Sequence, residues 1–131
     1  MRTPEQILRE ATTIAVVGAS PDPGRASHGV MRYLQRAGYR VLPVNPMACP
    51  GEILGVSCVP SLGDLDEPVD LVDVFRRSEF CADVARQARA IGAPALWLQL
   101  GVRSAEARSV AEAAGMDYVE DACTAVVHRS I

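Results

Sequence analysis

The chain has 131 residues, 49% of them hydrophobic and 22% charged, with a formal net charge of −3. This length suits one domain, and the hydrophobic fraction excludes a disordered chain. No apolar run reaches the ~18 residues that a membrane-spanning helix requires, and no signal-peptide core opens the sequence. We therefore expect one soluble domain, residues 1–131, located in the cytoplasm and without a membrane partner.

All 13 basic residues are arginines, so the chain contains no lysine. This excludes a Schiff base, a lysine general base and the phosphate-binding lysine of a Walker loop. Arginine remains available for bidentate contacts with phosphate. The arginines are spread along the sequence rather than gathered in a basic stripe, which argues against nucleic acid as a partner.

The cysteine pattern does not indicate a metal site, because no CxxC pair is present and the two histidines lie far apart. We interpret all four cysteines as small buried hydrophobes with reduced thiols. Cys123 follows two acidic residues, which makes it a poor nucleophile, and the sequence shows no catalytic set. The cysteines are Cys49, Cys58, Cys81 and Cys123.

The first predicted element is a short helix, which begins at the capping box Thr3-Pro4-Glu5-Gln6 and ends near Ala11. An apolar run rich in β-branched residues follows at 13–17 and predicts a central parallel strand. A loop rich in Pro, Gly and Ser leads to a predicted helix over residues 27–37, whose apolar residues repeat at helical spacing.

A second strand is predicted over residues 40–44, and Pro43 inside it favours a sheet edge or a strand end. The least regular part of the chain comes next, with a short strand around residues 56–59. The third core strand is predicted over residues 69–75, where we interpret Asp70 and Asp73 as strand-end or capping groups.

The remaining elements alternate in the same way. Ser78 is predicted to cap a helix whose apolar stripe runs from Phe80 to Ile91. The last predicted elements are a strand at 95–100, a helix at 104–114, a strand at 118–119 and an apolar tail at 125–127. This alternation predicts an α/β, Rossmann-like fold: an open, mostly parallel β-sheet with helices on both faces, in a single domain.

Ligands of such sheets bind outside the carboxyl ends of the strands, so the residues that follow each predicted strand are the candidate site. Small, polar, aromatic and cationic residues occupy these positions, a combination typical of a nucleotide crevice. The candidate residues at the strand ends are Gly18, Ala19, Ser20, Asn45, Pro46, Phe75, Arg76, Arg77, Gln99 and Gly101.

The loop after the first strand is the strongest candidate for a phosphate site. Gly18 allows a tight turn, and the helix that begins near Ser27 directs its free N–H groups and positive dipole end at the loop. Arg25 and the hydroxyls of Ser20 and Ser27 are the expected phosphate contacts. The spacing is not GxGxxG, so a loop that merely connects a strand to a helix is the alternative.

For three other candidate site residues, a structural role remains an alternative to a ligand contact. Phe75 is either a core residue or an adenine-stacking one, and Arg76 is either a ligand contact or a surface charge. Gln99 stands in an apolar run and serves either a ligand or a neighbouring loop. At the end of the second strand an NAD site requires an acidic residue, but the chain has Asn45 there, which argues against NAD.

Several motifs in combination resemble the small stand-alone bacterial CoA-binding proteins. They are Val17-Gly18-Ala19-Ser20, Pro23-x-Arg25-x-Ser27, the run from Gly38 to Pro46, Ile53-Leu54-Gly55, the run from Val69 to Arg76, the run from Leu96 to Val102, and Asp121-x-Cys123. The likeness covers roughly residues 10–128. These proteins are in turn similar to the CoA-binding N-terminal domain of the succinyl-CoA synthetase α subunit.

The resemblance implies a Rossmann-like domain that holds the ADP part of coenzyme A across the strand ends. It implies phosphate contacts from Gly18, Ala19, Ser20, Arg25 and Ser27. It further implies that Asn45, Pro46, Phe75 and Arg76 line the nucleotide pocket, with Gln99 and Gly101 further along the crevice. The chain has no counterpart of the synthetase's second domain, so the resemblance extends to binding and not to the reaction.

Two positions depart from the family pattern. Met47 stands where relatives often have lysine after the Asn-Pro step, which removes a cation that would contact phosphate. Ala122 and Thr124 replace the arginine and proline that usually surround the cysteine of the last motif, which puts thiol chemistry at Cys123 in doubt.

The sequence therefore predicts a module that binds CoA or acyl-CoA and has no catalytic set of its own. Two enzymatic alternatives remain open: an NAD-dependent oxidoreductase, and an acyl-CoA ligase half that a partner chain completes. A regulatory protein that senses CoA and contacts another protein is a third alternative, and a homo-oligomer is compatible with all of them.

Overall fold

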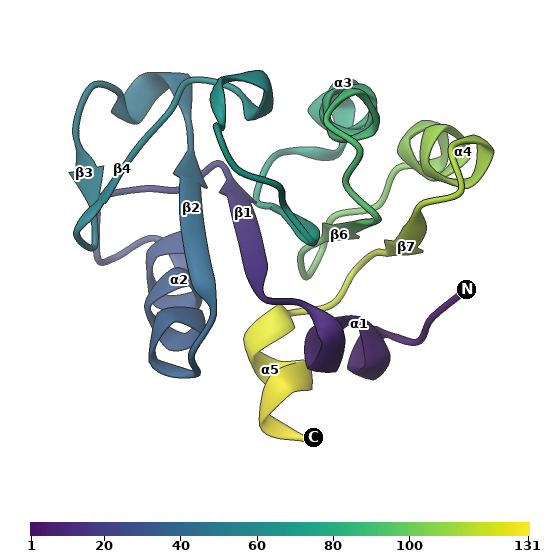
Figure 1. Ribbon diagram of the computed structural model, residues 1–131, viewed down its shortest axis with the longest axis horizontal. Coiled ribbons are helices and arrows are strands. Elements are labelled where there is room, and N and C mark those ends of the chain that lie inside the picture. The colour runs from purple at the N-terminus through teal and green to yellow at the C-terminus, as the bar shows by residue number, and fades with distance from the viewer.

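The central strands are apolar on both faces, so the fold needs helices on both sides of its sheet. The computed structural model describes residues 1–131 and contains five parallel strands in the order β2-β1-β5-β6-β7 (Figure 1). These strands are β1 (Thr13–Val17), β2 (Arg40–Val44), β5 (Leu71–Val74), β6 (Ala95–Leu98) and β7 (Asp117–Val119). The predicted Rossmann-like α/β fold is confirmed.

Three helices cover one face of the sheet and two cover the other (Figure 1). Helices α1 (Pro4–Glu10), α2 (Ala26–Arg36) and α5 (Thr124–Arg129) form the first layer, and α3 (Ser78–Ala90) and α4 (Ala105–Ala113) form the second. The connection from β2 to β5 contains the short helices η1 (Pro46–Ala48) and η2 (Leu62–Asp64) and an antiparallel hairpin of β3 (Glu52–Ile53) and β4 (Val56–Ser57).

The alternation of side chains along β1 divides the core into two clusters. Ile14 and Val16 pack with residues of α1 and α2, whereas Ala15 and Val17 pack with residues of α3. Trp97 of β6 is fully buried in the first cluster. None of the helices has both the length and the apolar character that a membrane-spanning segment requires.

Most predicted elements are observed, and two are observed residue for residue. The strands at 13–17 and 40–44 match β1 and β2, and β2 lies at the edge of the sheet, as Pro43 indicates. The predicted strands at 69–75 and 95–100 are shorter in the structure. Both end early at the carboxyl side, where the chain turns out of the sheet, and β5 also begins two residues later than predicted. The other predicted helices and strands are also observed, in the predicted order along the chain.

Three predictions about the helices and their residues are wrong. The apolar tail at 125–127 belongs to helix α5, which packs against α1 and α2. Ser78 is the first residue of α3 rather than its cap, and its hydroxyl accepts a hydrogen bond from the Arg103 N–H. Phe80 is 42% exposed and contacts an arginine, while Cys81, Val84, Ala85 and Ala88 form the buried face of α3.

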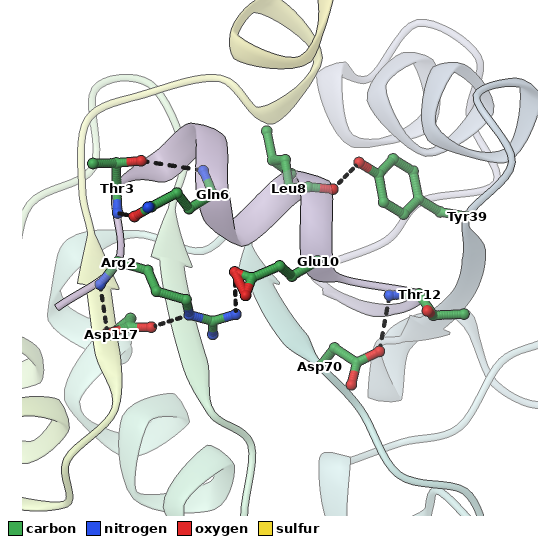
Figure 2. A network of polar contacts seen from close by, with 9 residues as sticks. All are labelled: Arg2, Thr3, Gln6, Leu8, Glu10, Thr12, Tyr39, Asp70 and Asp117. Carbon is green, nitrogen blue, oxygen red and sulfur yellow. Dashed lines mark hydrogen bonds and ion pairs between the residues drawn. The ribbon is translucent and has the colours of Figure 1, made fainter. Parts of the chain in front are cut away.

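The N-terminal segment is attached to the sheet by polar contacts (Figure 2). The capping box predicted for Thr3 and Gln6 is present in both directions. Arg2 donates from Nε to Oδ2 of Asp117 in β7 at 2.6 Å, and the Tyr39 hydroxyl donates to the Leu8 carbonyl oxygen. These contacts hold α1 across the amino ends of the strands.

Asp70 has a separate role at the beginning of β1 (Figure 2). Its Oδ2 accepts hydrogen bonds from the N–H groups of Thr12 and Thr13, each at 2.9 Å. The carboxylate thus satisfies two donors where the chain enters the sheet, as expected for a strand-end group.

We predict that Asp70→Ala lowers the free energy of unfolding by about 1–3 kcal/mol, because two N–H donors lose a charged acceptor. Asp66→Ala is the matched control, since Asp66 is exposed and makes no hydrogen bond to the backbone. Denaturant unfolding of both variants measures the effect. Equal stability of the two variants would show that the Asp70 contacts contribute nothing.

Candidate functional site

Successive strands are added to the sheet in opposite directions on the two sides of the β1–β5 pair. From β1 the chain proceeds through α2 to β2 on one side, and from β5 it proceeds through α3 to β6 on the other side. Such a switch point leaves a crevice at the carboxyl ends of the two strands, where ligands of open α/β sheets bind. Gly18 follows β1 and Phe75 follows β5, so these two residues form the floor of the crevice.

Gly18 fits this position because it has no side chain. Its φ is +88°, and a Cβ built on it would lie 2.6 Å from the Phe75 carbonyl oxygen. Its N–H donates to the Val44 carbonyl oxygen at 2.8 Å, which fixes the turn against β2. A larger residue here would both strain the backbone and push the two strand ends apart.

A cavity of about 460 Å³ opens beside this turn. The N-terminus of α2 forms part of its wall, and the first N–H groups of a helix have no intrahelical acceptor. Together with the exposed guanidinium of Arg25 they make the cavity favourable for an anion. The residues that line it are Gly18, Ser20, Pro21, Arg25, Ala26, Ser27, Asn45, Met47, Ala48 and Phe75.

The loop between β1 and α2 is ordered by its own hydrogen bonds. The Asp22 N–H donates to the Ser20 hydroxyl at 3.1 Å, and the Gly24 N–H donates to Asp22 Oδ1 at 2.9 Å. The Arg25 N–H donates to the Asp22 carbonyl oxygen at 3.0 Å. The Ser20 hydroxyl accepts in this network, so its own proton remains free to be donated to a ligand.

A second cavity, of about 250 Å³, adjoins the first and shares Gly18 and Asn45 with it. Arg76 lines this cavity, and its guanidinium carbon lies 4.5 Å from the centroid of the Phe80 ring. The exposed Phe80 therefore supports the arginine instead of packing in the core. The complete lining is Val17, Gly18, Val44, Asn45, Pro46, Pro60, Ser61, Arg76, Val84 and Gln87.

Asn45 connects the loops that follow β1 and β2. Its side-chain Nδ2 donates to the Ala19 carbonyl oxygen at 2.8 Å, and its Oδ1 accepts from the Met47 N–H at 2.9 Å. Ala19 is fully buried and does not line either cavity, so it contributes this carbonyl oxygen rather than a ligand contact. The wall between the two cavities thus depends on one amide side chain.

Gln99 and Gly101 do not line the two cavities either. Gln99 is 5% exposed, and its Nε2 donates to Asp73 Oδ1 and to Thr124 Oγ1. The Gly101 N–H donates to Asp121 Oδ1 at 2.7 Å. The amide of Gln99 is thus engaged inside the fold, where it links the residue that follows β6 to β5 and α5.

Asp73 is the centre of this internal network rather than a strand-end or capping group. It is fully buried within β5, and its Oδ2 accepts from the Thr124 hydroxyl at 2.9 Å. Burial raises the pKa of Asp73 to about 7, although its hydrogen bonds with Gln99 and Thr124 act in the opposite direction. The structure therefore contains a core carboxyl group that titrates near neutral pH.

Some lining residues were not predicted from the sequence. Ser61 and Gln87 reach the second cavity from the segment before η2 and from α3, and nothing in their local sequence marks them. Three other lining residues are adjacent in sequence to predicted ones, so the predicted loops already indicated their position. They are Pro21, Ala26 and Ala48.

A parallel sheet with a glycine turn and an arginine-lined cavity at its switch point is typical of a Rossmann-like nucleotide-binding domain. The family model that matches the sequence is narrower: it is described as "CoA binding domain" and covers residues 12–129. The chain belongs to this family of CoA-binding domains.

Comparison with known proteins agrees with this membership. The chain is 42% identical to the Bacillus subtilis protein YneT over 124 residues, which are 95% of this chain and 90% of YneT. It superposes on the Thermus thermophilus protein called cell-free ID.343 with a TM-score of 0.93 and 42% identity, over 98% of both chains.

Larger ligases contain a similar region. The ADP-forming acetate–CoA ligase of Methanocaldococcus jannaschii is 30% identical over 59 residues, which are 45% of this chain and 8% of the ligase. The dinucleotide-forming acetyl-coenzyme A synthetase 1 of Ca. Korarchaeum cryptofilum superposes with a TM-score of 0.71 at 27% identity, over 82% of this chain and 25% of the synthetase. The chain therefore resembles only a small part of these enzymes.

We predict that Gly18→Ala lowers the free energy of unfolding by about 2 kcal/mol or more, because a positive φ and a contact with a backbone oxygen both oppose a Cβ. Gly29→Ala is the control, since Gly29 lies inside α2, where an added Cβ would meet no atom within 4 Å. That variant should be stabilised by up to ~1 kcal/mol. Thermal or denaturant unfolding distinguishes them, and a neutral Gly18→Ala would contradict the close approach of the two strands.

The pKa of Asp73 predicts how stability depends on pH. The carboxyl titrates at about pH 7 in the folded chain and at ~3.9 in the unfolded chain, so between these values only the folded state holds the proton. Relative to Asp73→Asn, the wild-type chain should lose about 2–4 kcal/mol of stability as the pH rises from ~4 to ~7, and little more above that. Unfolding midpoints of both proteins across this range measure the difference, and parallel pH profiles would contradict the shift.

Proposed function

We propose that the chain binds coenzyme A through its ADP part, with the diphosphate in the first cavity at the N-terminus of α2. The observation that carries this proposal is the anion-favouring cavity at the switch point of a chain that belongs to the CoA-binding domains. Arg25, Ser20 and Ser27 are the proposed side-chain contacts for the phosphates. Backbone N–H groups of α2 would supply the remaining donors, as at other phosphate-binding helix termini.

The adenosine part is proposed to extend into the second cavity. The guanidinium of Arg76, which lies over the Phe80 ring, would contact the phosphate on the ribose. Pro46 and Asn45 would form the adjoining wall of the cavity. Phe75 lines the first cavity and is also partly buried against the core, so we propose that it forms part of the cavity wall. We leave Ala19, Gln99 and Gly101 outside the proposed contact set, because they lie outside both cavity linings.

The end of β2 favours CoA over NAD. An NAD site presents a carboxylate there to the ribose hydroxyls. Asn45 occupies the position, and both polar atoms of its side chain are engaged by Ala19 and Met47. We therefore propose a CoA ligand rather than a nicotinamide dinucleotide.

We further propose that the chain supplies binding rather than acyl transfer. The similarity to the Methanocaldococcus jannaschii ligase spans 8% of that enzyme, and the superposition on the Korarchaeum synthetase spans 25% of that chain. An acyl-CoA ligase activity would thus need the rest of such an enzyme in addition to these residues.

Titration of the purified chain with CoA, dephospho-CoA and NAD tests the ligand. CoA at about 100 times its Kd should stabilise the fold by roughly 2.7 kcal/mol, which thermal unfolding detects as a shift of several degrees. The shift should be smaller with dephospho-CoA, which lacks the 3′-phosphate, and absent with NAD. A shift with NAD alone would replace this proposal with an oxidoreductase, and no shift with any of the three would reject a nucleotide site.

Arginine variants test the location of the site. Arg25→Ala and Arg76→Ala should each weaken CoA binding about tenfold or more, because each removes a charge-assisted contact. Arg36→Ala removes the same charge from the exposed C-terminal end of α2, the end remote from the cavity, and should bind CoA like the wild type. Calorimetric titration gives the Kd values. Unchanged affinity in both Arg25→Ala and Arg76→Ala would place the ligand elsewhere.

A further inference from the structure

Two of the four cysteines lie side by side next to the first cavity. Cys49 follows η1 and Cys58 follows β4, so the pair brackets the β3–β4 hairpin. The Cys49 thiol donates a hydrogen bond to the Asn45 carbonyl oxygen at 3.1 Å, and the Cys58 thiol donates to the same oxygen at 3.5 Å. A single backbone oxygen therefore holds both sulfur atoms.

The segment that carries the two thiols is ordered. The Cys58 N–H donates to the Gly51 carbonyl oxygen at 2.9 Å and so extends the hairpin ladder. Ile53 in the hairpin is buried in the core, and the Gln35 side chain of α2 donates to the Leu54 carbonyl oxygen. The approach of the sulfurs is thus a property of packed backbone, not of a loose loop.

The two thiols differ in accessibility. Cys58 is 8% exposed, and burial, together with a hydrogen bond to Cys49, raises the pKa of its thiol to about 12. Cys49 is only half-buried. A reagent from solution would therefore reach Cys49 first, and Cys58 is placed to react with the product.

We propose that Cys49 and Cys58 are a thiol–disulfide exchange site, which a low-molecular-weight disulfide RS–SR converts into an intramolecular disulfide that weakens ligand binding in the adjoining cavity. The Cys49 thiolate attacks one sulfur of RS–SR, and the RS⁻ that leaves takes up the proton released by Cys49. Cys58 then attacks the Cys49 sulfur of the mixed disulfide, and the second RS⁻ leaves with the Cys58 proton. The protein dithiol is oxidised, and one RS–SR is reduced to two RSH.

Asn45 connects this reaction to the cavity. In the disulfide neither sulfur carries a proton, so the Asn45 carbonyl oxygen loses both of its thiol donors. The oxygen keeps the Ala48 N–H, which donates to it at 3.1 Å, but a bond between the two sulfurs changes how Cys49 and Cys58 pack against Asn45. Asn45 joins Ala19 to Met47 and lines both cavities, so a displacement of its backbone also moves the cavity wall. This coupling rests on the proposed function, whereas formation of the disulfide does not.

The proposed coupling predicts how strongly oxidation weakens CoA binding, and how strongly CoA in turn opposes oxidation. Loss of the Asn45 contacts should weaken CoA binding on the order of tenfold, the change that ~1.4 kcal/mol produces. By linkage, bound CoA must then oppose oxidation by the same factor, which corresponds to a midpoint reduction potential about 30 mV higher at saturating CoA.

Peptide mapping after incubation with glutathione disulfide tests the disulfide. Trypsin can cleave this lysine-free chain only at arginine, so Cys49 and Cys58 share the peptide 41–76, while Cys81 and Cys123 fall in the separate peptides 78–86 and 109–129. After alkylation of the remaining thiols, peptide 41–76 should be unalkylated and lighter than its reduced form by two hydrogen atoms. The other two peptides should be alkylated.

Single serine variants test the order of attack. Cys58→Ser should retain a glutathione adduct on Cys49, since no second thiol resolves it, and Cys49→Ser should remain unmodified. Cys123→Ser, which alters a half-buried cysteine outside the pair, should behave like the wild type. A fully alkylated peptide 41–76 in the wild type, or an adduct on Cys58 in Cys49→Ser, would overturn the proposal.

Calorimetric titration of the reduced and oxidised chain with CoA tests the coupling. Binding should weaken about tenfold on oxidation in the wild type, while Cys49→Ser, whose hydroxyl can still donate to Asn45, should bind equally before and after exposure to glutathione disulfide. Equal affinities of the reduced and oxidised wild type would overturn the coupling and leave the proposed function intact. Failure of the reduced chain to bind CoA would overturn the proposed function and the coupling together, whereas peptide 41–76 reports the disulfide independently.

Discussion

The burial of β1 on both faces is the constraint on which the rest of the molecule depends. Ile14 and Val16 require cover from α1 and α2, and Ala15 and Val17 require it from α3. A parallel sheet obtains such cover only through helical crossovers, and those of β1 and β5 leave in opposite directions. The crevice at the switch point is therefore a by-product of core formation, and only the carboxyl ends of the strands remain open for a ligand.

The candidate site combines modest charge with strict geometry. Its cations are arginines, because the chain has no lysine, and Met47 stands in the first cavity where a further cation could have been. Oriented backbone has to supply what side-chain charge does not, so the position of α2 relative to Gly18 and the division of the cavities by Asn45 become decisive. Small displacements of these loops should thus matter more than the loss of a distant surface charge.

The sequence could predict those features that depend on local pattern. The β-branched run of β1, the proline in edge strand β2 and the capping box at Thr3 have a direct local signature, and the structure contains all three. Helix α5 has no such signature: it is six residues long, and its stability comes from packing against α1 and α2. The pairing of Gln99 with Asp73 and the arrival of Ser61 at the cavity are likewise long-range events, which no local pattern encodes.

The link between Asp73 and Thr124 has a consequence for synthesis on the ribosome. The two residues are 51 positions apart, and the hydroxyl of Thr124 is one of only two side-chain donors to the buried carboxyl. While the polypeptide is still emerging, β5 can pair with β1 but its carboxyl group lacks the partner from α5. The nascent sheet therefore carries an unmet polar group in its interior until the last helix has left the exit tunnel, and this favours late closure of that face over stepwise, strand-by-strand consolidation.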